Sequence, residues 1–120
     1  MAIAVTSPQA AKSGFIKNAT SADASGTEEI IAAPTAGVSI VVEYLVISSD
    51  AAISVTIGEG ETGGDVTTAL IGPVTFAAGQ TIAWPFVGRA QGMALTAATS
   101  LTVDASGAGN ICVWVQGYTG

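Results

Sequence analysis

A short acidic segment holds the side chains with the clearest capacity for chemistry. Glu59, Glu61 and Asp65 lie in the stretch Gly58-Glu59-Gly60-Glu61-Thr62-Gly63-Gly64-Asp65. Carboxylate oxygens are ligands that Ca²⁺ prefers, so these three side chains form a weak candidate cation site. Their spacing does not match the EF-hand loop. A solvated hairpin loop that holds no metal is therefore the interpretation we favour.

Catalysis by the usual side-chain groups is hard to build from this sequence. The chain has no histidine, which removes the commonest general base and the Ser-His-Asp and Cys-His pairs. Glu28 and Glu29 are adjacent, and on a strand they would face opposite sides. A glycosidase needs two carboxylates across a sugar-binding cleft. We predict that the chain is not an enzyme, with no catalytic residue and no bound cofactor.

Cys112 is the only cysteine in the chain. An intramolecular disulfide and a Cys-rich metal site are therefore excluded. The residue lies in the apolar run 111–115, which has no cationic neighbour to activate a thiol. We predict an inert thiol that is buried like a small hydrophobic side chain.

Four aromatic side chains are candidates for an interface, because Trp and other aromatic residues anchor protein contacts. They are Trp84, Phe86, Trp114 and Tyr118. The pair Trp84 and Phe86 alternates with Ile82, a pattern for which core packing is the commoner outcome, so we favour core packing for this pair. In the last apolar run, Trp114 and Tyr118 lie on the face opposite Ile111, Val113 and Val115. If those aliphatic residues face the core, the aromatic face meets a neighbouring subunit or an overlying arm.

β-Strands are the elements that must position these side chains. From Val38 onward, β-branched and aromatic residues dominate. The runs 38–47 and 110–118 are apolar on both alternating faces, which predicts central or covered strands. Ile53, Val55 and Ile57 alternate with polar residues, as in a half-buried strand. Pro85 predicts that its strand lies at a sheet edge or ends there.

The spacing of these runs predicts an all-β fold. Strands that recur every 8–12 residues between Gly- and Ser-rich turns indicate an antiparallel β-sandwich. Two long two-faced strands with shorter ones between them favour a jelly-roll-like form. An immunoglobulin-like sandwich is the alternative, but it lacks the Cys-Trp-Cys pattern. We place the sandwich domain at 38–120, after an extended N-terminal arm at 1–37 with short strands; a disordered tail is the other reading of the arm.

Charge and composition exclude several classes of partner. The net charge is −6, and the only bases are Lys12, Lys17 and Arg89. Such a chain cannot neutralise phosphates, so we expect no nucleic-acid partner and no anionic-membrane partner. We read no signal peptide and no membrane span, so we expect synthesis in the cytoplasm. Only 10% of residues are charged, which suits a subunit covered by neighbours.

The region after Val38 resembles the capsid decoration (cement) proteins of tailed bacteriophages, or a related phage virion β-sandwich protein. The resemblance lies in the general residue pattern and not in a defined motif. It is carried by the stretches "VVEYLVISSDAAISVTIG", "AAGQTIAWPF" and "GMALTAATSLTVDASGAGNICVWVQGY" and by the closing Tyr-Thr-Gly. It implies a structural protein on the capsid exterior that bridges major capsid subunits as a homo-oligomer, with a trimer as first choice. No functional residue carries over from such a pattern.

Two other functions stay open. Tail, fibre and baseplate domains of phages share the same residue pattern, so the chain could belong to one of those parts. A carbohydrate-binding β-sandwich module is the third possibility, with Trp84 or Trp114 as the platform on which a sugar stacks.

Overall fold

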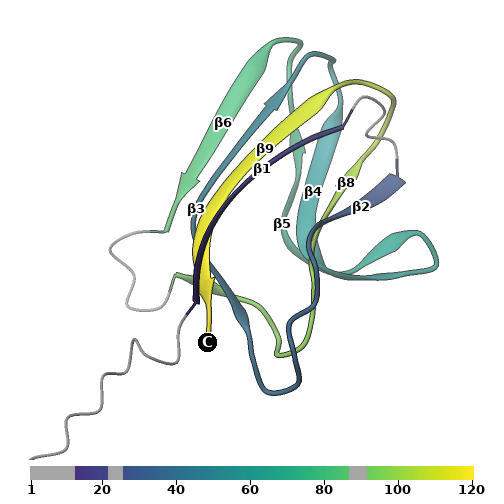
Figure 1. Cartoon of the computed structure of the whole chain (residues 1–120). Helices are drawn as coiled ribbons and strands as arrows, with labels where there is room; N and C mark the ends of the chain where they lie inside the picture. Colours follow the sequence, from purple (N-terminus) through teal and green to yellow (C-terminus); the bar gives the residue numbers. More distant parts are fainter. Residues whose placement is uncertain (1–12, 22–25, 87–91) are drawn as a thin grey trace, which may run out of the picture.

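Two antiparallel β-sheets form the protein in a computed structural model, which describes residues 13–21, 26–86 and 92–120 (Figure 1). These residues contain nine strands and no helix, which confirms the all-β prediction. Sheet A has the order β1-β9-β3-β6, with the short β7 paired to β3; sheet B has the order β2-β8-β4-β5. No membrane-crossing helix is found within the described segments.

The chain passes repeatedly between the two sheets. Sheet A contains β1 (Ser13–Ser21), β3 (Ile40–Ser49), β6 (Gln80–Pro85), β7 (Met93–Ala94) and β9 (Ile111–Thr119). Sheet B contains β2 (Gly26–Ile31), β4 (Ser54–Thr62), β5 (Asp65–Thr75) and β8 (Leu101–Ala105). Only the β4–β5 hairpin and the β6–β7 connection stay within one sheet. Strands far apart in sequence, such as β1 and β9, therefore lie side by side.

The core lies between the sheets, as in a sandwich. Each sheet contributes alternate side chains to it, because successive residues of a strand point to opposite faces. The largest fully buried members are Phe76, Ile40, Leu45, Ile47, Ile57 and Leu101. A bulge between Val42 and Tyr44 shifts the pairing of β3 with β9 by one residue. Val42 and Leu45 consequently both face the core, although they are three residues apart.

Three predictions about strand position are confirmed. The two long strands that are apolar on both faces, β3 and β9, are neighbours in the middle of sheet A. The strand with Pro85, β6, lies at the edge of that sheet and ends at this proline. A proline lacks the N–H that a second neighbour would need, so the edge is where it can be accommodated.

The segments 13–21 and 26–31 belong to the two sheets, although the sequence placed them in an arm. β1 pairs with β9 over its whole length, and β2 pairs with β8. The strand pattern in their sequence is weak because both strands lie at sheet edges, where many side chains stay exposed and polar. Residues 1–12 lie outside the described residues, so an arm there stays a prediction.

The stretch 58–64, predicted as a loop, is mostly strand. β4 continues to Thr62, and only Gly63 and Gly64 form the turn. Both have positive φ, at 62° and 86°, as a two-residue type I′ hairpin turn requires. Gly58 is buried within the strand, and the position requires glycine because a Cβ there would overlap the Val66 side chain. This glycine therefore permits close packing and does not mark a turn.

Candidate functional site

The three candidate cation ligands do not share one site. Glu59 is 8% exposed, whereas Glu61 and Asp65 are exposed near the hairpin turn. Across the described ranges, no three or more carboxylate, thiol or imidazole side chains are placed so that they could hold a metal ion. The carboxylate of Glu59 instead faces Thr96, in the loop that follows β7.

Glu59 fastens that loop to sheet B. Its Oε2 accepts a hydrogen bond from the Thr96 backbone N–H at 2.7 Å, and its Oε1 accepts one from Thr96 Oγ1 at 2.6 Å. Next to it, the Gly60 N–H donates to the Ser100 carbonyl at 3.0 Å. Hydrogen bonds to a charged group are roughly twice as strong as neutral ones. The buried carboxylate therefore has a structural role, which the sequence did not reveal.

We expect the Glu59→Ala variant to lose about 2 kcal/mol of unfolding free energy, because the two Thr96 donors lose their charged acceptor. Urea unfolding followed by tryptophan fluorescence would measure the loss. Glu61→Ala removes an exposed carboxylate from the same strand and should change stability by less than about 0.5 kcal/mol. Equal losses for the two variants would show that the Thr96 contacts do not hold the loop.

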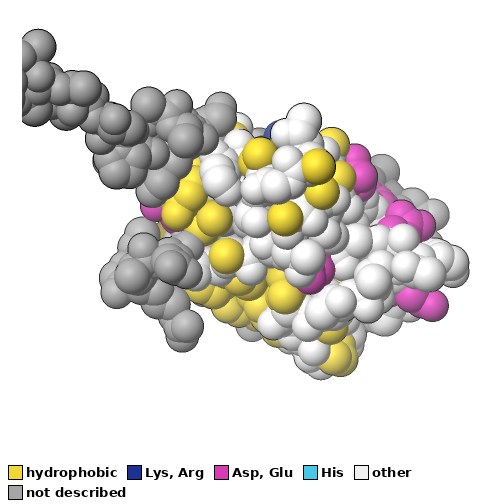
Figure 2. Space-filling view, turned by 90° about the horizontal axis from the view of Figure 1, so that it is seen from below, with side chains coloured by type: hydrophobic (Ala, Val, Ile, Leu, Met, Phe, Trp, Pro, Cys, Tyr) yellow, Lys and Arg dark blue, Asp and Glu magenta, His cyan; other side chains and the backbone are white. Residues whose placement is uncertain are grey.

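The outer face of sheet B is polar. The strand register places Thr27, Glu29, Thr56 and Asp104 on the side away from the core. Thr102 lies on the same side but is buried, and its hydroxyl donates to the Gly60 carbonyl at 2.9 Å. Alternation of an apolar inner face with a polar outer face is what a sheet exposed to water requires. Figure 2, seen from below, shows most of the visible Asp and Glu side chains toward the side on which the β4–β5 hairpin lies.

The outer face of sheet A differs sharply in chemistry. We define it by the residues that the register places away from the core: Gly14, Ile16, Asn18 and Thr20 of β1, Cys112, Trp114, Gln116 and Tyr118 of β9, Val41, Tyr44, Val46 and Ser48 of β3, Thr81, Ala83 and Pro85 of β6, and Ala94 of β7. None of these residues is charged. Two carboxylates border the face: Glu43, at the bulge of β3, lines one of the two adjoining hollows, and Asp50 lines the other.

Aromatic side chains occupy the middle of this face. The rings of Tyr44 and Trp114 meet edge to face, with centroids 5.8 Å apart and planes at 77°. Val46 lies opposite Trp114 across the β3–β9 ladder, and Tyr118 lies opposite Val41. An edge-to-face pair adds about 0.5–1.5 kcal/mol beyond burial of its area. Trp114 is therefore held in one orientation while it stays partly accessible.

The four aromatic interface candidates fall on different sides of sheet A. Trp84 lies opposite Leu45 on the inner face, and its ring meets that of the buried Phe76 at 6.5 Å. Phe86 also packs partly against the core. Trp114 and Tyr118 remain on the outer face. The sequence favoured this division, and the pairing with β3 decides which face of each strand is buried.

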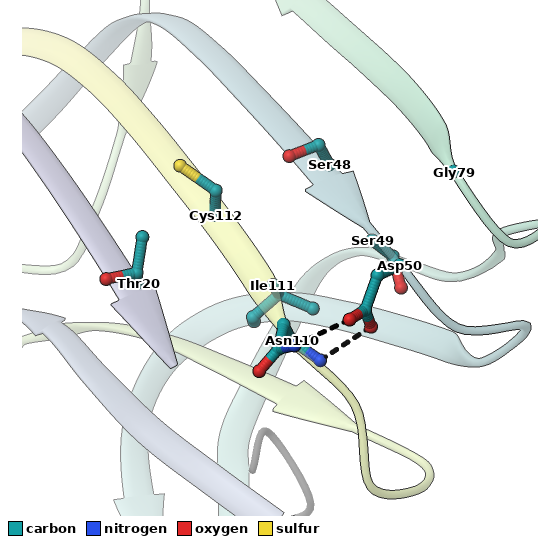
Figure 3. A pocket seen from close by; sticks show the side chains of 8 residues that line it. All are labelled: Thr20, Ser48, Ser49, Asp50, Gly79, Asn110, Ile111 and Cys112. Atoms are coloured by element: carbon teal, nitrogen blue, oxygen red, sulfur yellow. Dashed lines mark hydrogen bonds between the residues drawn. The ribbon is translucent and has the colours of Figure 1, made fainter. Parts of the chain in front are cut away.

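A shallow hollow of about 540 Å³ lies at one end of the outer face (Figure 3). Asp50 and Asn110 point toward each other there: Asp50 accepts from the Asn110 N–H at 2.7 Å and from Nδ2 at 2.6 Å. The carboxylate thus ties the β8–β9 loop to the end of β3. The hydroxyls of Thr20 and Ser48 and the Cys112 thiol come from three adjacent strands of sheet A. The hollow therefore presents small polar groups beside an internally satisfied carboxylate.

Cys112 is half-buried on the outer face and does not lie in the core as we predicted. Its Sγ donates to Asn18 Oδ1 of β1 at 3.2 Å. The reason is register: Ile111 and Val113 face the core, so the residue between them must point outward.

The uncharged aromatic face of sheet A is the candidate functional site. It combines partly exposed Trp and Tyr side chains with a sheet that the core already holds rigid. No protein-family model, curated protein or solved structure matches the chain.

Proposed function

We propose that the chain is a structural virion protein that decorates and stabilises a phage capsid by bridging major capsid subunits. The observation that carries the proposal is the outer face of sheet A, whose register-defined residues are all uncharged in a chain of net charge −6. Desolvation of a face without charged groups costs little free energy when another protein covers it. Its function would then be to add interface area.

Trp114, Tyr44 and Tyr118 are the anchors of the proposed contact. Trp and Tyr are enriched among the residues that dominate binding energy, above all where the surrounding structure already holds them in place. The edge-to-face contact between Trp114 and Tyr44 supplies that order before binding. Thr20 and Ser48 lie toward one end of the face, and Gln116 lies between Trp114 and Tyr118; all three can donate and accept hydrogen bonds in a contact.

We further infer that the sandwich is of the jelly-roll class. The orders β1-β9-β3-β6 and β2-β8-β4-β5 support this, since a jelly roll divides eight strands between two sheets joined by Greek-key connections. β7 is then a two-residue addition beside β3. The fold alone does not assign a function, because jelly rolls serve many.

The proposal extends to partners and location. The chain would act as a homo-oligomer on the exterior of the capsid, for which the trimer implied by the resemblance and a two-fold pair through β1 are alternative orders. A tail, fibre or baseplate position would use the same face of sheet A. Glycan binding is a second candidate, favoured by the hydroxyl-lined hollow one pleat away from Trp114. Quenching of tryptophan fluorescence by neutral oligosaccharides would be its direct sign.

Co-sedimentation with assembled heads of the encoding phage tests the proposal. Ala83 is exposed on the outer face of sheet A, and Thr75 is exposed on the edge strand of sheet B. We expect Ala83→Lys to weaken head binding about tenfold, because the contact would bury an unpaired ammonium. Thr75→Lys adds the same charge and should leave binding unchanged. If neither variant lost affinity for heads, or if both lost it equally, the outer face of sheet A would not be the surface that binds the capsid.

A further inference from the structure

The two sheets expose four edge strands, and three of them are blunted. β6 ends at Pro85, and β5 has two irregularities in its pairing with β4, one of them at Pro73. β2 is short, carries Glu28 and Glu29, and has a register shift before Ile31. Prolines, bulges, charges and short length are the devices by which proteins prevent an edge from pairing with another chain.

β1 has only one of these devices, the single charge of Lys17. Its nine residues pair with β9 without a register shift, and they include no proline and no acidic residue. Along the described part of the chain, no strand pairs with its other edge. Ile16 in its centre is 69% exposed and is the one large hydrophobic side chain so exposed in the described residues. A long, regular edge with an exposed aliphatic residue is a template for a further strand.

We propose that β1 pairs antiparallel with β1 of a second copy of this chain, about a two-fold axis that places Ile16 opposite its own counterpart. Sheets A of the two copies then become one continuous sheet. The contact is isologous, with the same strand contributed by each copy.

Side-chain chemistry selects this register. A two-fold axis at Lys17 would set two ammonium groups directly opposite each other, which destabilises an antiparallel pair. An axis at Asn18 would set Ile16 against the hydroxyl of Thr20. An axis at Ile16 pairs residues 13–19 of one copy with 19–13 of the other. It joins the two exposed isoleucines and sets Lys17 opposite Phe15.

The charge distribution favours a second copy as the occupant. Two chains that each carry −6 repel each other over most of their surfaces. β1 has no carboxylate, and it carries Lys17. The paired strands themselves therefore bring no two carboxylates together.

Pairing would also enlarge the proposed docking face. Strands about 4.8 Å apart with a rise of about 3.3 Å per residue give the outer face of sheet A an area of roughly 550 Å². A specific interface usually buries about 800 Å² per partner. Two joined faces exceed that area. This consequence rests on the proposed function, whereas the β1 pairing itself does not.

Cysteine cross-linking tests the register. The background is Cys112→Ser, which removes the native thiol and keeps a donor for Asn18. Residues directly opposite in an antiparallel pair have Cα atoms about 4.5–5.5 Å apart, within the range that a disulfide spans. Ile16→Cys should therefore give a covalent dimer under mild oxidation. Thr20→Cys is on the same face of β1, but the register puts the two cysteines about 27 Å apart, so it should stay unlinked.

A charge pair gives an independent test in solution. Ile16→Lys and Ile16→Glu should each sediment as monomers, because like charges meet across the axis. An equimolar mixture should form a dimer with one copy of each. A mixture that stays monomeric, equal cross-linking at positions 16 and 20, no cross-linking at position 16, or a wild-type trimer would each overturn the proposal. If the dimer forms but does not bind heads, only the proposed function fails.

Discussion

Replacing Gly117 by alanine should remove about 3 kcal/mol of unfolding free energy, because a methyl group at this position cannot be packed without moving the backbone. A Cβ on Gly117 would overlap the Val41 carbonyl oxygen and would lie 3.1 Å from the Phe15 ring. Gly117 pairs with Val42 of β3 and with Phe15 of β1. The β3 backbone would therefore have to move away from β9, and the Phe15 ring would have to shift slightly. Guanidinium unfolding followed by circular dichroism would measure the loss.

Gly14→Ala is the matched control, since Gly14 lies on β1 next to the same strand. The nearest atom to a Cβ there is the Gly117 carbonyl oxygen at 3.9 Å, an ordinary contact. Its stability should change by less than about 0.5 kcal/mol. Equal effects at the two glycines would show that β9 does not approach β3 as closely as described.

The second large effect concerns binding. The Trp114→Ala variant should bind phage heads about a hundredfold more weakly, because a well-packed tryptophan at the centre of an interface contributes 2 kcal/mol or more. Trp114 lies between Val46 of β3 and Asn18 of β1 on the outer face, so most of the face surrounds it. Titration of heads with labelled protein would give the affinity.

Two controls separate lost binding from lost folding. Trp114→Phe keeps an aromatic ring against Tyr44 and should retain most of the affinity. The thermal transition of Trp114→Ala should stay cooperative, since the core residues Val113 and Val115 face the other way. Unchanged head binding by Trp114→Ala would remove this tryptophan from the proposed contact.

The strands in the middle of the fold could be predicted because their residues obey simple periodicities. Val55 and Ile57 alternate with threonine and glycine, and both are buried. The run 40–47 is apolar on both faces, and it occupies the middle of sheet A. Such patterns follow from burial on one or both sides of a sheet.

The edge strands were harder to predict. β5 begins at Asp65 and contains Thr67, Thr68 and Pro73, so its sequence looks like a loop. It is a strand because β4 supplies hydrogen bonds along one side. β1 is similar, since most of its side chains are exposed. Local sequence carries little information where tertiary pairing supplies the stability.

The candidate site depends on contacts between residues that are distant in sequence. The sequence favoured core packing for Trp84 and placed Trp114 on a face away from the core, as observed, but it could not show which strands lie beside each of them. Those neighbours follow from the register of β3 with β6 and β9. The burial of Glu59 was equally hidden, because its partner Thr96 is 37 residues away.

Cryo-electron microscopy of heads saturated with the protein tests the central claim most directly. The account predicts density on the capsid exterior at the junctions between major capsid subunits, with the outer face of sheet A, and Trp114 within it, against the shell. Density that places the outer face of sheet B against the shell, or heads that bind no protein at saturating concentration, would contradict it.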